Sequence, residues 1–195
     1  MTTNTTADRQ YHHGNLRRAL LDEALRVVEE DGPSAVSLRE LARRIGVSHA
    51  APAHHFADKT ALFTAIAVEG QTMLAEGLEA AAGSSEDNQG HSRFLDVGLA
   101  YVRFAAEHPA HIRVMYQPSL YNTEDPAVAA ARRRTFETLF ATAGAFKPGA
   151  DAAQVGLAGW ALMHGLAALW QGGNLGEFGD DPVKLANWVA EVTFS

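Results

Sequence analysis

Apolar residues recur every three or four positions along almost the whole chain, which is the period of an amphipathic helix. The pattern is clear from Leu16 to Val28. The triplet Asp31-Gly32-Pro33 marks its end, because glycine favours a helix C-cap and proline cannot continue the helix. No strand-like alternation and no internal repeat stands out. The pattern therefore predicts an all-α protein of about nine helices.

Residues 37–59 predict two short helices joined by a tight turn. Ser37 and Glu40 have the spacing of a capping box, which starts the first helix. Gly46 can adopt the positive φ that ends this helix abruptly. Ser48 can cap the second helix and point its free N–H groups toward a phosphate. Two helices with such a turn form the plan of a helix-turn-helix DNA reader.

Six further helices are predicted after this segment. Asp58 and Asp181 are good N-caps, and Pro126 suits the first position of a helix. A polar loop is expected near residues 83–90. The helices are expected after Asp58, around residues 94–105, at 110–116, from 126 to about 146, from 148 to 171, and from 182 onward.

The charge of the chain is unevenly distributed. The formal net charge is −7 at pH 7. Residues 1–59 hold eight Lys/Arg, eight Asp/Glu and five His, whereas residues 60–195 hold eight Lys/Arg and fifteen Asp/Glu. Exposed charges more than about 10 Å apart are screened at ordinary salt, so the acidic part need not prevent DNA binding. This balance supports a two-part chain and disfavours a nonspecific architectural DNA protein.

Composition limits the location and the chemistry of the protein. Cysteine is absent, which excludes disulfides and thiolate metal sites and fits a reducing cytoplasm. The first residues lack the apolar segment of a signal peptide. Residues 152–170 carry no formal charge and are almost long enough to span a bilayer, but Gln154 and His164 interrupt them. We expect a core or interface helix there, no membrane association, and a cytoplasmic protein.

Several motifs, in order along the chain, resemble one family. They are Tyr11–Arg17 (YHHGNLR), Ser37–Ala42 (SLRELA), Gly46–Ser48 (GVS), the pair His55-Phe56, and Lys59. Together they resemble the TetR/AcrR transcriptional regulators over residues 11–75. In the C-terminal part, Trp160–Gly165 resembles the signature of a TetR subfamily named for a Trp-His-Gly motif.

The resemblance implies a DNA-binding transcriptional regulator with two domains. The polar residues 1–10 indicate a disordered tail, and the family plan places a helix-turn-helix DNA-binding domain at 11–58 and a helical ligand-binding and dimerisation domain at 59–195. It implies a homodimeric repressor that a small molecule releases from a pseudopalindromic double-stranded DNA operator. Residues 149–171 and 181–194 would form the dimer interface, although their small residues can equally pack within one subunit.

Phosphate and base contacts are expected from different residues. Three positions match family residues that touch the DNA backbone: Ser37, Ser48 and Lys59. The serines stand at expected helix starts, and a lysine in a first helical turn is poorly placed unless a phosphate is near. The alternative is plain capping by the serines and a solvated lysine. Base reading is assigned to His49, Ala50, Ala51 and His54; imidazole can hydrogen-bond to base edges, and alanine methyls can contact thymine methyl groups.

Three neighbouring positions complete the predicted DNA site. His55 is expected to seat the second helix in the core together with Phe56, and it can also reach a phosphate. Arg39 can approach DNA, with a solvated helix face as an equal alternative. Family members commonly carry a tyrosine two residues before the His-Phe pair, whereas this chain has Ala53. An aromatic contact is therefore lost, which weakens any carry-over of operator preference from relatives.

An apolar ligand site with a few polar groups is predicted in the C-terminal part. The residues assigned to it are Tyr101, Phe104, Met115, Tyr116, Trp160, Met163 and His164. Aromatic and methionine residues at helical spacing are more often plain core, so this alternative stays open for each of them. Trp160 and His164 are four residues apart and share a helix face. His164 is the preferred ligand contact.

No cofactor, no metal site and no enzymatic activity is expected. His108 and His111 stand three residues apart, but Pro109 between them spoils the geometry, and a complete ligand set is missing. The chain also lacks a phosphate-binding glycine loop, a Gly-x-Ser-x-Gly elbow and a His-Glu-x-x-His helix. The alternative to a regulator is a helical small-molecule-binding protein or enzyme without specific DNA binding.

Overall fold

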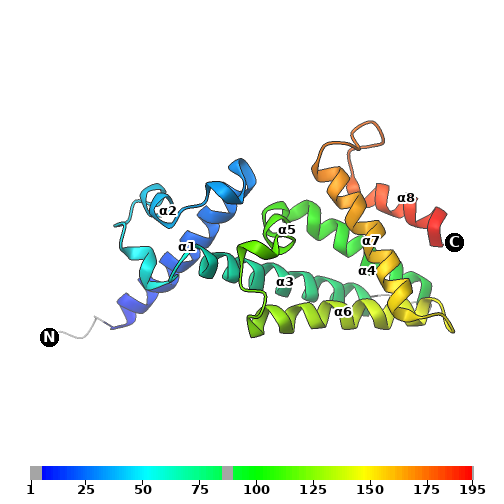
Figure 1. Cartoon of the computed structure of the whole chain (residues 1–195). Coiled ribbons are helices and arrows are strands. Elements are labelled where there is room, and N and C mark those ends of the chain that lie inside the picture. Colours follow the sequence, from blue (N-terminus) through cyan, green and yellow to red (C-terminus); the bar gives the residue numbers. More distant parts are fainter. Residues whose placement is uncertain (1–5, 85–89, 195) are drawn as a thin grey trace. The chain divides into compact units, whose positions relative to one another are not determined.

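The computed structural model (Figure 1) describes residues 6–84 and 90–194 and, within them, the side chains of residues 16–84 and 93–194. These ranges contain eight α-helices and no β-strand, which confirms the all-α prediction. The α-helices are α1 (Thr6–Asp31), α2 (Leu38–Arg44), α3 (Lys59–Ser84), α4 (Gly90–Glu107), α5 (Pro109–Met115), α6 (Pro126–Phe146), α7 (Ala152–Gln171) and α8 (Pro182–Phe194). Three short 3₁₀-helices accompany them, η1 (Pro33–Ala35), η2 (Ala51–His54) and η3 (Pro118–Leu120).

The predicted count of about nine helices was slightly too high, because the second helix of the helix-turn-helix is not an α-helix. It is the 3₁₀-helix η2, which contains Pro52. Proline has no N–H, so it cannot donate the bond to Ser48 that an α-helical turn would need here. The backbone instead closes through tighter bonds, from Ala51 N–H to the Ser48 carbonyl (3.0 Å) and from Ala53 N–H to the Ala50 carbonyl (3.3 Å).

Two helix starts differ from their predictions. Helix α1 begins at Thr6, so residues 6–10 of the expected tail are helical, and residues 1–5 lie outside the described residues. Helix α7 begins at Ala152 instead of residue 148. Gly149 has a φ of 87°, which interrupts a helix, and the Asp151 carboxylate then caps α7 by accepting from Ala153 N–H at 2.8 Å.

The chain divides into two compact units. Unit 1 consists of the residues up to 68 together with residues 110–125, and unit 2 of residues 69–109 and 126–195. The division falls within α3, whereas the predicted domain boundary stood at residues 58/59. Asn122 N–H donates to the Thr64 hydroxyl at 3.0 Å, and this bond joins the 110–125 segment to the first part of α3.

Unit 1 is built on the apolar face of α1 that the sequence pattern predicts. The buried core residues on this face are Leu20, Leu21, Ala24, Val27 and Val28. Helix α2 packs against α1 (Figure 1) and contributes buried Leu41 and Ala42. The Arg113 guanidinium on α5 donates to the carbonyls of Val28 and Glu29, both at 3.0 Å, and so caps the C-terminal end of α1.

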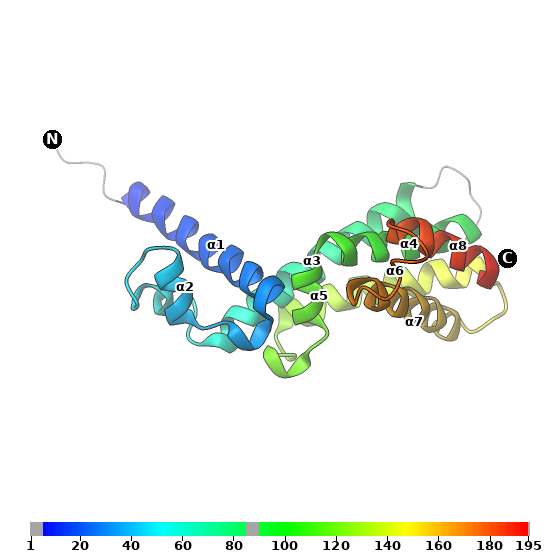
Figure 2. The same cartoon turned by 90° about the horizontal axis from the view of Figure 1, so that it is seen from above.

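Unit 2 is a bundle in which α4 packs against α6, α7 and α8, and α6 packs against α7 (Figure 2). Helices α4 and α7 approach closely where α7 carries Gly159: a Cβ at this position would lie 2.5 Å from Cζ of Phe94. The Phe94 ring is stacked on Phe146, with 5.1 Å between centroids, and meets the edge of Phe194 at 5.5 Å. Small residues of α7 thus allow packing within the subunit, one of the two roles expected of them.

Candidate nucleic-acid interface

Helix α2 starts at Ser37 without the predicted capping box. Ser37 is the N-cap residue with extended backbone (φ −143°, ψ 129°), and its side chain makes no capping hydrogen bond. The Glu40 carboxylate instead accepts from Arg43 at 2.6 Å and from Arg44 at 3.0 Å. The capping-box prediction was therefore wrong, because two arginines one helical turn further on compete for Glu40. The exposed Ser37 hydroxyl is left without a role in the cap.

The turn after α2 has the predicted geometry. Gly46 has a φ of 75°, the left-handed conformation that glycine adopts without steric penalty. Val47 N–H donates to the Ala42 carbonyl at 2.9 Å, and Gly46 N–H donates to the Arg43 carbonyl at 3.3 Å. This pair of bonds is the Schellman motif, which satisfies the last carbonyls of α2 and fixes the direction of the following chain.

Residues 48–55, which we call the reading segment, present short side chains and imidazoles to solvent. Ser48, His49, Ala50 and His54 are exposed, Ala51 and His55 are half-buried, and Pro52 is buried. Phe56, directly after the segment, is 3% exposed. The segment is thus anchored by Pro52 and Phe56, with the predicted base-reading positions between and before them. Sequence reasoning missed Pro52 as an anchor, although its restricted φ was a usable signal.

Ser48 does not cap a helix as predicted. The helix η2 begins at Ala51, its N-cap is Ala50, and no side chain caps it. The Ser48 carbonyl accepts from Ala51 N–H, and its side chain is exposed. With Pro52 in a helix of only four residues, the N-cap position moves from Ser48 to Ala50, two residues further on. A hydroxyl contact to phosphate stays chemically available to Ser48, but the expected support from a helix N-terminus is lost.

Lys59 joins α3 to the turn before α2. Asp58 caps α3 as predicted, because its Oδ1 accepts from Ala61 N–H at 2.7 Å. The Lys59 ammonium donates to the Ser34 carbonyl at 3.2 Å and lies 5.5 Å from the centroid of the Phe63 ring. An ammonium has three donors, so this contact leaves Lys59 able to bind a phosphate as well. The hydrogen bond to Ser34 fixes the position of the Lys59 ammonium.

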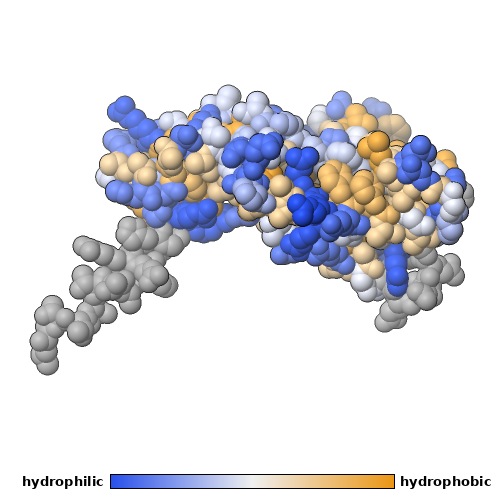
Figure 3. Space-filling model, turned by 60° about the horizontal axis from the view of Figure 1, so that its bottom comes forward, coloured by the Kyte–Doolittle hydropathy of each residue, from blue (hydrophilic) through white to orange (hydrophobic). Residues whose placement is uncertain are grey.

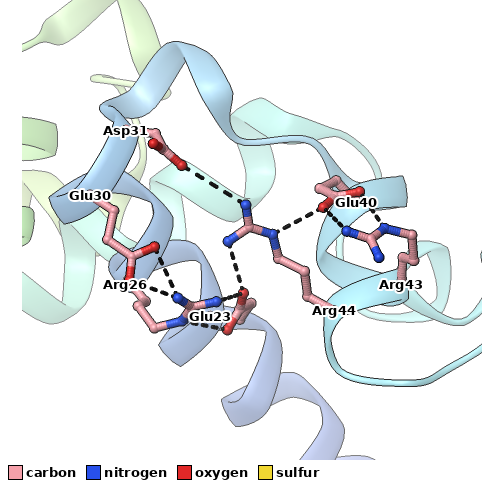
Figure 4. Close-up of polar contacts among 7 residues, drawn as sticks. All are labelled: Glu23, Arg26, Glu30, Asp31, Glu40, Arg43 and Arg44. Atoms are coloured by element: carbon pink, nitrogen blue, oxygen red, sulfur yellow. Dashed lines mark hydrogen bonds and ion pairs between the residues drawn. The ribbon is translucent and has the colours of Figure 1, made fainter.

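A group of ion pairs links α1 and α2 (Figure 4). We call it the α1–α2 ion-pair cluster; its members are Glu23, Arg26, Glu30, Asp31, Glu40, Arg43 and Arg44. Arg44 reaches Glu40 on its own helix and Glu23 on α1, at 3.0 and 3.5 Å. Hydrogen bonds from Arg43 and then Arg44 lower the pKa of Glu40 to about 2, so its carboxylate stays charged at neutral pH. Three of the arginines of unit 1 are therefore neutralised by carboxylates.

Arg39 and Arg17 differ from these arginines. Both are exposed, and for neither is an ion pair found among the described side chains. The Arg17 guanidinium lies over the ring of Phe56, with 5.3 Å from Cζ to the ring centroid. Arg39 was among the predicted DNA residues, whereas Arg17 was part of a family motif without an assigned role.

Five of the seven predicted ligand residues lie in unit 2. Tyr101 Oη and His164 Nδ1 are 2.7 Å apart, and the Trp160 and His164 rings are 6.3 Å apart. Met163 and Phe104 are buried. Burial lowers the pKa of His164 and favours its neutral form.

Met115 and Tyr116 belong to unit 1, so the seven residues do not form one group within unit 2. The Met115 carbonyl accepts from the Tyr121 hydroxyl at 3.0 Å. Phe136 packs edge-on against Trp160 at 5.7 Å and was not predicted as part of this region. Its place on α6 at helical spacing from Phe140 was the only sequence signal. The side chains of Tyr11–His13 lie outside the described residues.

Two family models match the chain. Residues 20–66 match bacterial regulatory proteins of the tetR family, and residues 94–193 match the tetracyclin repressor-like C-terminal domain. The "Uncharacterized HTH-type transcriptional regulator YobS" of Bacillus subtilis (strain 168) is 28% identical over 112 residues, 57% of this chain and 55% of YobS. The "HTH-type transcriptional repressor Rv1474c" of Mycobacterium tuberculosis is 42% identical over 64 residues. That match covers 33% of this chain and 34% of the repressor. The chain thus spans about half or less of the length of these curated relatives.

Solved structures share the fold over nearly the whole chain. A protein of unknown function from Rhodococcus sp. RHA1 superposes with a TM-score of 0.78 at 34% identity, covering 94% of this chain and 96% of that one. The TetR family transcriptional regulator PfmR from Thermus thermophilus has a TM-score of 0.71 at 22% identity, with 97% and 96% covered. The second likeness is one of fold alone. With both family models matched and the helix-turn-helix in place, the chain belongs to the tetR family of bacterial regulatory proteins, which are DNA-binding transcriptional regulators.

Proposed function

We propose that this protein is a homodimeric, sequence-specific regulator, a repressor that a small molecule releases from a pseudopalindromic operator, and not an enzyme. The observation that carries the DNA-binding part is the reading segment. Its exposed side chains stand between a Schellman turn and two buried anchors, Pro52 and Phe56. A segment held in this way can present His49 and His54 to base edges without rearrangement of the core.

We assign the backbone contacts to residues around the reading segment. Ser37 and Ser48 have exposed hydroxyls, and Lys59 is held at the start of α3 by the Ser34 carbonyl. Arg39 is exposed on α2, on which Arg43 and Arg44 are paired with Glu40. Ala50 and Ala51 complete the base-reading surface, and half-buried His55 is assigned to positioning with a phosphate contact as an additional role.

The homodimer is supported by the outer face of α7 and α8. Large apolar side chains are exposed there or in the connecting loop: Leu157 (56%), Leu169 (50%), Phe178 (64%), Trp188 (58%) and Val192 (78%). Figure 3 shows hydrophobic surface gathered on a face of unit 2. By length and composition alone α7 could cross a membrane, and 28% of its apolar window is buried inside the subunit. One side of α7 packs on α4, α6 and α8 within the subunit, and we assign its exposed apolar side to the subunit interface.

The ligand is proposed to bind in unit 2 beside Tyr101 and His164. Their 2.7 Å contact, together with Trp160, Met163 and Phe104, combines one polar pair with apolar surroundings. Because burial keeps His164 neutral by lowering its pKa, a ligand that exchanges hydrogen bonds with an imidazole fits better than one that needs a cation. Met115 and Tyr116 stay part of the ligand prediction, as does membership of the Trp-His-Gly subfamily.

The experiment that tests the function is selection of bound DNA from a random-sequence duplex library, with sequencing of the bound fraction. An enriched pseudopalindrome with half-sites about one helical turn apart, roughly 34–36 Å, is expected from a symmetric dimer. Enrichment of a single half-site would overturn the dimeric arrangement. Binding without any enrichment, by a folded protein, would overturn sequence-specific reading and favour the alternative of a helical small-molecule-binding protein.

A further inference from the structure

We propose that Arg17 on α1 is a further DNA contact, which binds a backbone phosphate next to the reading segment. The proposal rests on the DNA-binding function proposed above and adds a residue from a helix that lies outside the helix-turn-helix. It rests on two observations. The first is which arginines of unit 1 are paired with carboxylates and which are exposed to solvent, and the second is the position of the Arg17 guanidinium.

Most of the unit 1 arginines whose side chains the structure describes have internal partners. On α1, Arg18 Nε donates to Asp22 at 2.8 Å, and Arg26 is bound by Glu23 and Glu30. On α2, Arg43 and Arg44 share Glu40. A guanidinium whose donors are occupied by a carboxylate has little net charge to offer a phosphate. These four arginines therefore form ion pairs within unit 1 and are poor candidates for DNA contacts.

Arg17 has a different partner, an aromatic ring. Its Cζ lies 5.3 Å from the centroid of Phe56, whose own side chain is 3% exposed. A guanidinium over a ring uses its flat face, and the five N–H donors at its edge stay available. The ring holds the cation in place without neutralising it. A planar donor fork of this kind suits a phosphate, which accepts two parallel hydrogen bonds.

The position of Phe56 determines where on unit 1 the proposed phosphate contact of Arg17 lies. Phe56 follows the last residue of the reading segment directly, and its backbone N–H donates to the Pro52 carbonyl at 2.9 Å. The Arg17 charge is therefore fixed beside the end of the segment that is proposed to contact base edges, which a helix-turn-helix reads in the major groove. Phosphates line both edges of that groove. An arginine at this place can set the register of the reading segment without reading a base.

The alternative is that Arg17 only covers Phe56 with its aliphatic stem. Two variants separate the roles. Arg17→Met keeps an unbranched stem on the ring and removes the charge, and Arg17→Lys keeps the charge and removes the planar fork. Arg18→Ala is the matched control, because Arg18 is the neighbouring exposed arginine of α1 and is paired with Asp22.

The test is the salt dependence of binding to a synthetic duplex of fixed mixed sequence, measured by fluorescence anisotropy with the full chain. Loss of one phosphate contact lowers the slope of log K against log salt by about 0.9 per subunit. We expect this change for Arg17→Met and not for Arg18→Ala, with Arg17→Lys retaining most of the slope. Thermal unfolding of each variant checks that the fold is kept.

Three results would overturn the proposal, and they are distinguishable. If Arg17→Met binds with the wild-type slope and affinity, the Arg17 assignment is wrong while the DNA-binding function stands. If the wild-type protein itself binds no duplex, both the assignment and the proposed function fail. Weaker binding of Arg17→Met with an unchanged slope would also contradict a phosphate contact, because loss of packing alone releases no counterions.

Discussion

The close approach of α4 and α7 can be tested by adding a single methyl group, with Gly159→Ala. The new Cβ would lie 2.5 Å from Cζ and 3.2 Å from Cε1 of Phe94, much closer than side chains normally pack. The Phe94 ring has little room to withdraw, because Phe146 stacks on it and Phe194 meets it edge-on. Either the ring or a helix must move, and both changes loosen the contact of the helices that carry Tyr101 and His164.

The size of the effect follows from two opposing terms. Overpacking of a core costs roughly 1–3 kcal/mol, and replacing glycine by alanine inside a helix contributes roughly 0.5–1 kcal/mol of stabilisation. The net expectation is a loss of about 1 kcal/mol, within a range of about 0–2.5 kcal/mol, in the free energy of unfolding, or a fall in Tm of a few degrees for a chain of this size. Urea unfolding at one fixed protein concentration measures it, since the stability of the proposed dimer would depend on concentration.

Gly77→Ala is the matched control for this experiment. Gly77 lies on the exposed side of α3, and a Cβ there meets nothing within 4 Å. The same chemical change should therefore stabilise the protein, by roughly 0.5–1 kcal/mol. Combining Gly159→Ala with Phe94→Leu should recover part of the loss. The steric reasoning is refuted if Gly159→Ala is as stable as Gly77→Ala.

Three further predictions address the two units separately. His54→Ala should weaken binding by about 1–3 kcal/mol at particular base pairs of a selected operator; equal losses on all sequences would remove His54 from base reading. Because burial depresses the pKa of His164 below its usual 6.5, the stability it contributes is present above that pH and is lost as pH falls. As the pH is lowered below 6.5, the urea midpoint should therefore fall less in His164→Asn than in the wild type. The same pH dependence in both proteins would contradict this role of His164. Trp188→Glu should yield monomers in sedimentation experiments, whereas Arg133→Glu, at an exposed position of α6, should not. A dimeric Trp188→Glu variant would show that the interface lies elsewhere.

Features decided by neighbouring residues could be predicted well. The N-caps Asp58 and Asp181 and the turn at Gly46 depend on contacts within a few positions, and the structure has all three. The capping box failed for an equally local reason that was overlooked, because Arg43 and Arg44 compete for Glu40. Pro52 likewise decides between an α-helix and a 3₁₀-helix, and its missing N–H was visible in the sequence.

Contacts between distant segments could not be predicted from periodicity. Tyr101 and His164 are 63 residues apart, and only the packing of α4 on α7 brings their polar atoms to 2.7 Å. Residue type alone likewise did not show that the predicted ligand residues divide between unit 2 and, for Met115 and Tyr116, unit 1. Arg17 carried no signal of its own, since its contact with Phe56 joins residues on separate elements.

The anchoring of the reading segment has a consequence for how such a protein can change its target during evolution. Pro52 and Phe56 hold the segment by burial, whereas His49, Ala50, Ala53 and His54 are exposed. Exposed substitutions usually alter stability by no more than about 0.5 kcal/mol. Mutations at these four positions can therefore accumulate with almost no selection against misfolding, and the variants can be selected by the DNA sequence that they bind. On the base reading proposed above, a new operator specificity is accessible by single substitutions, and libraries restricted to these positions should yield mostly folded proteins.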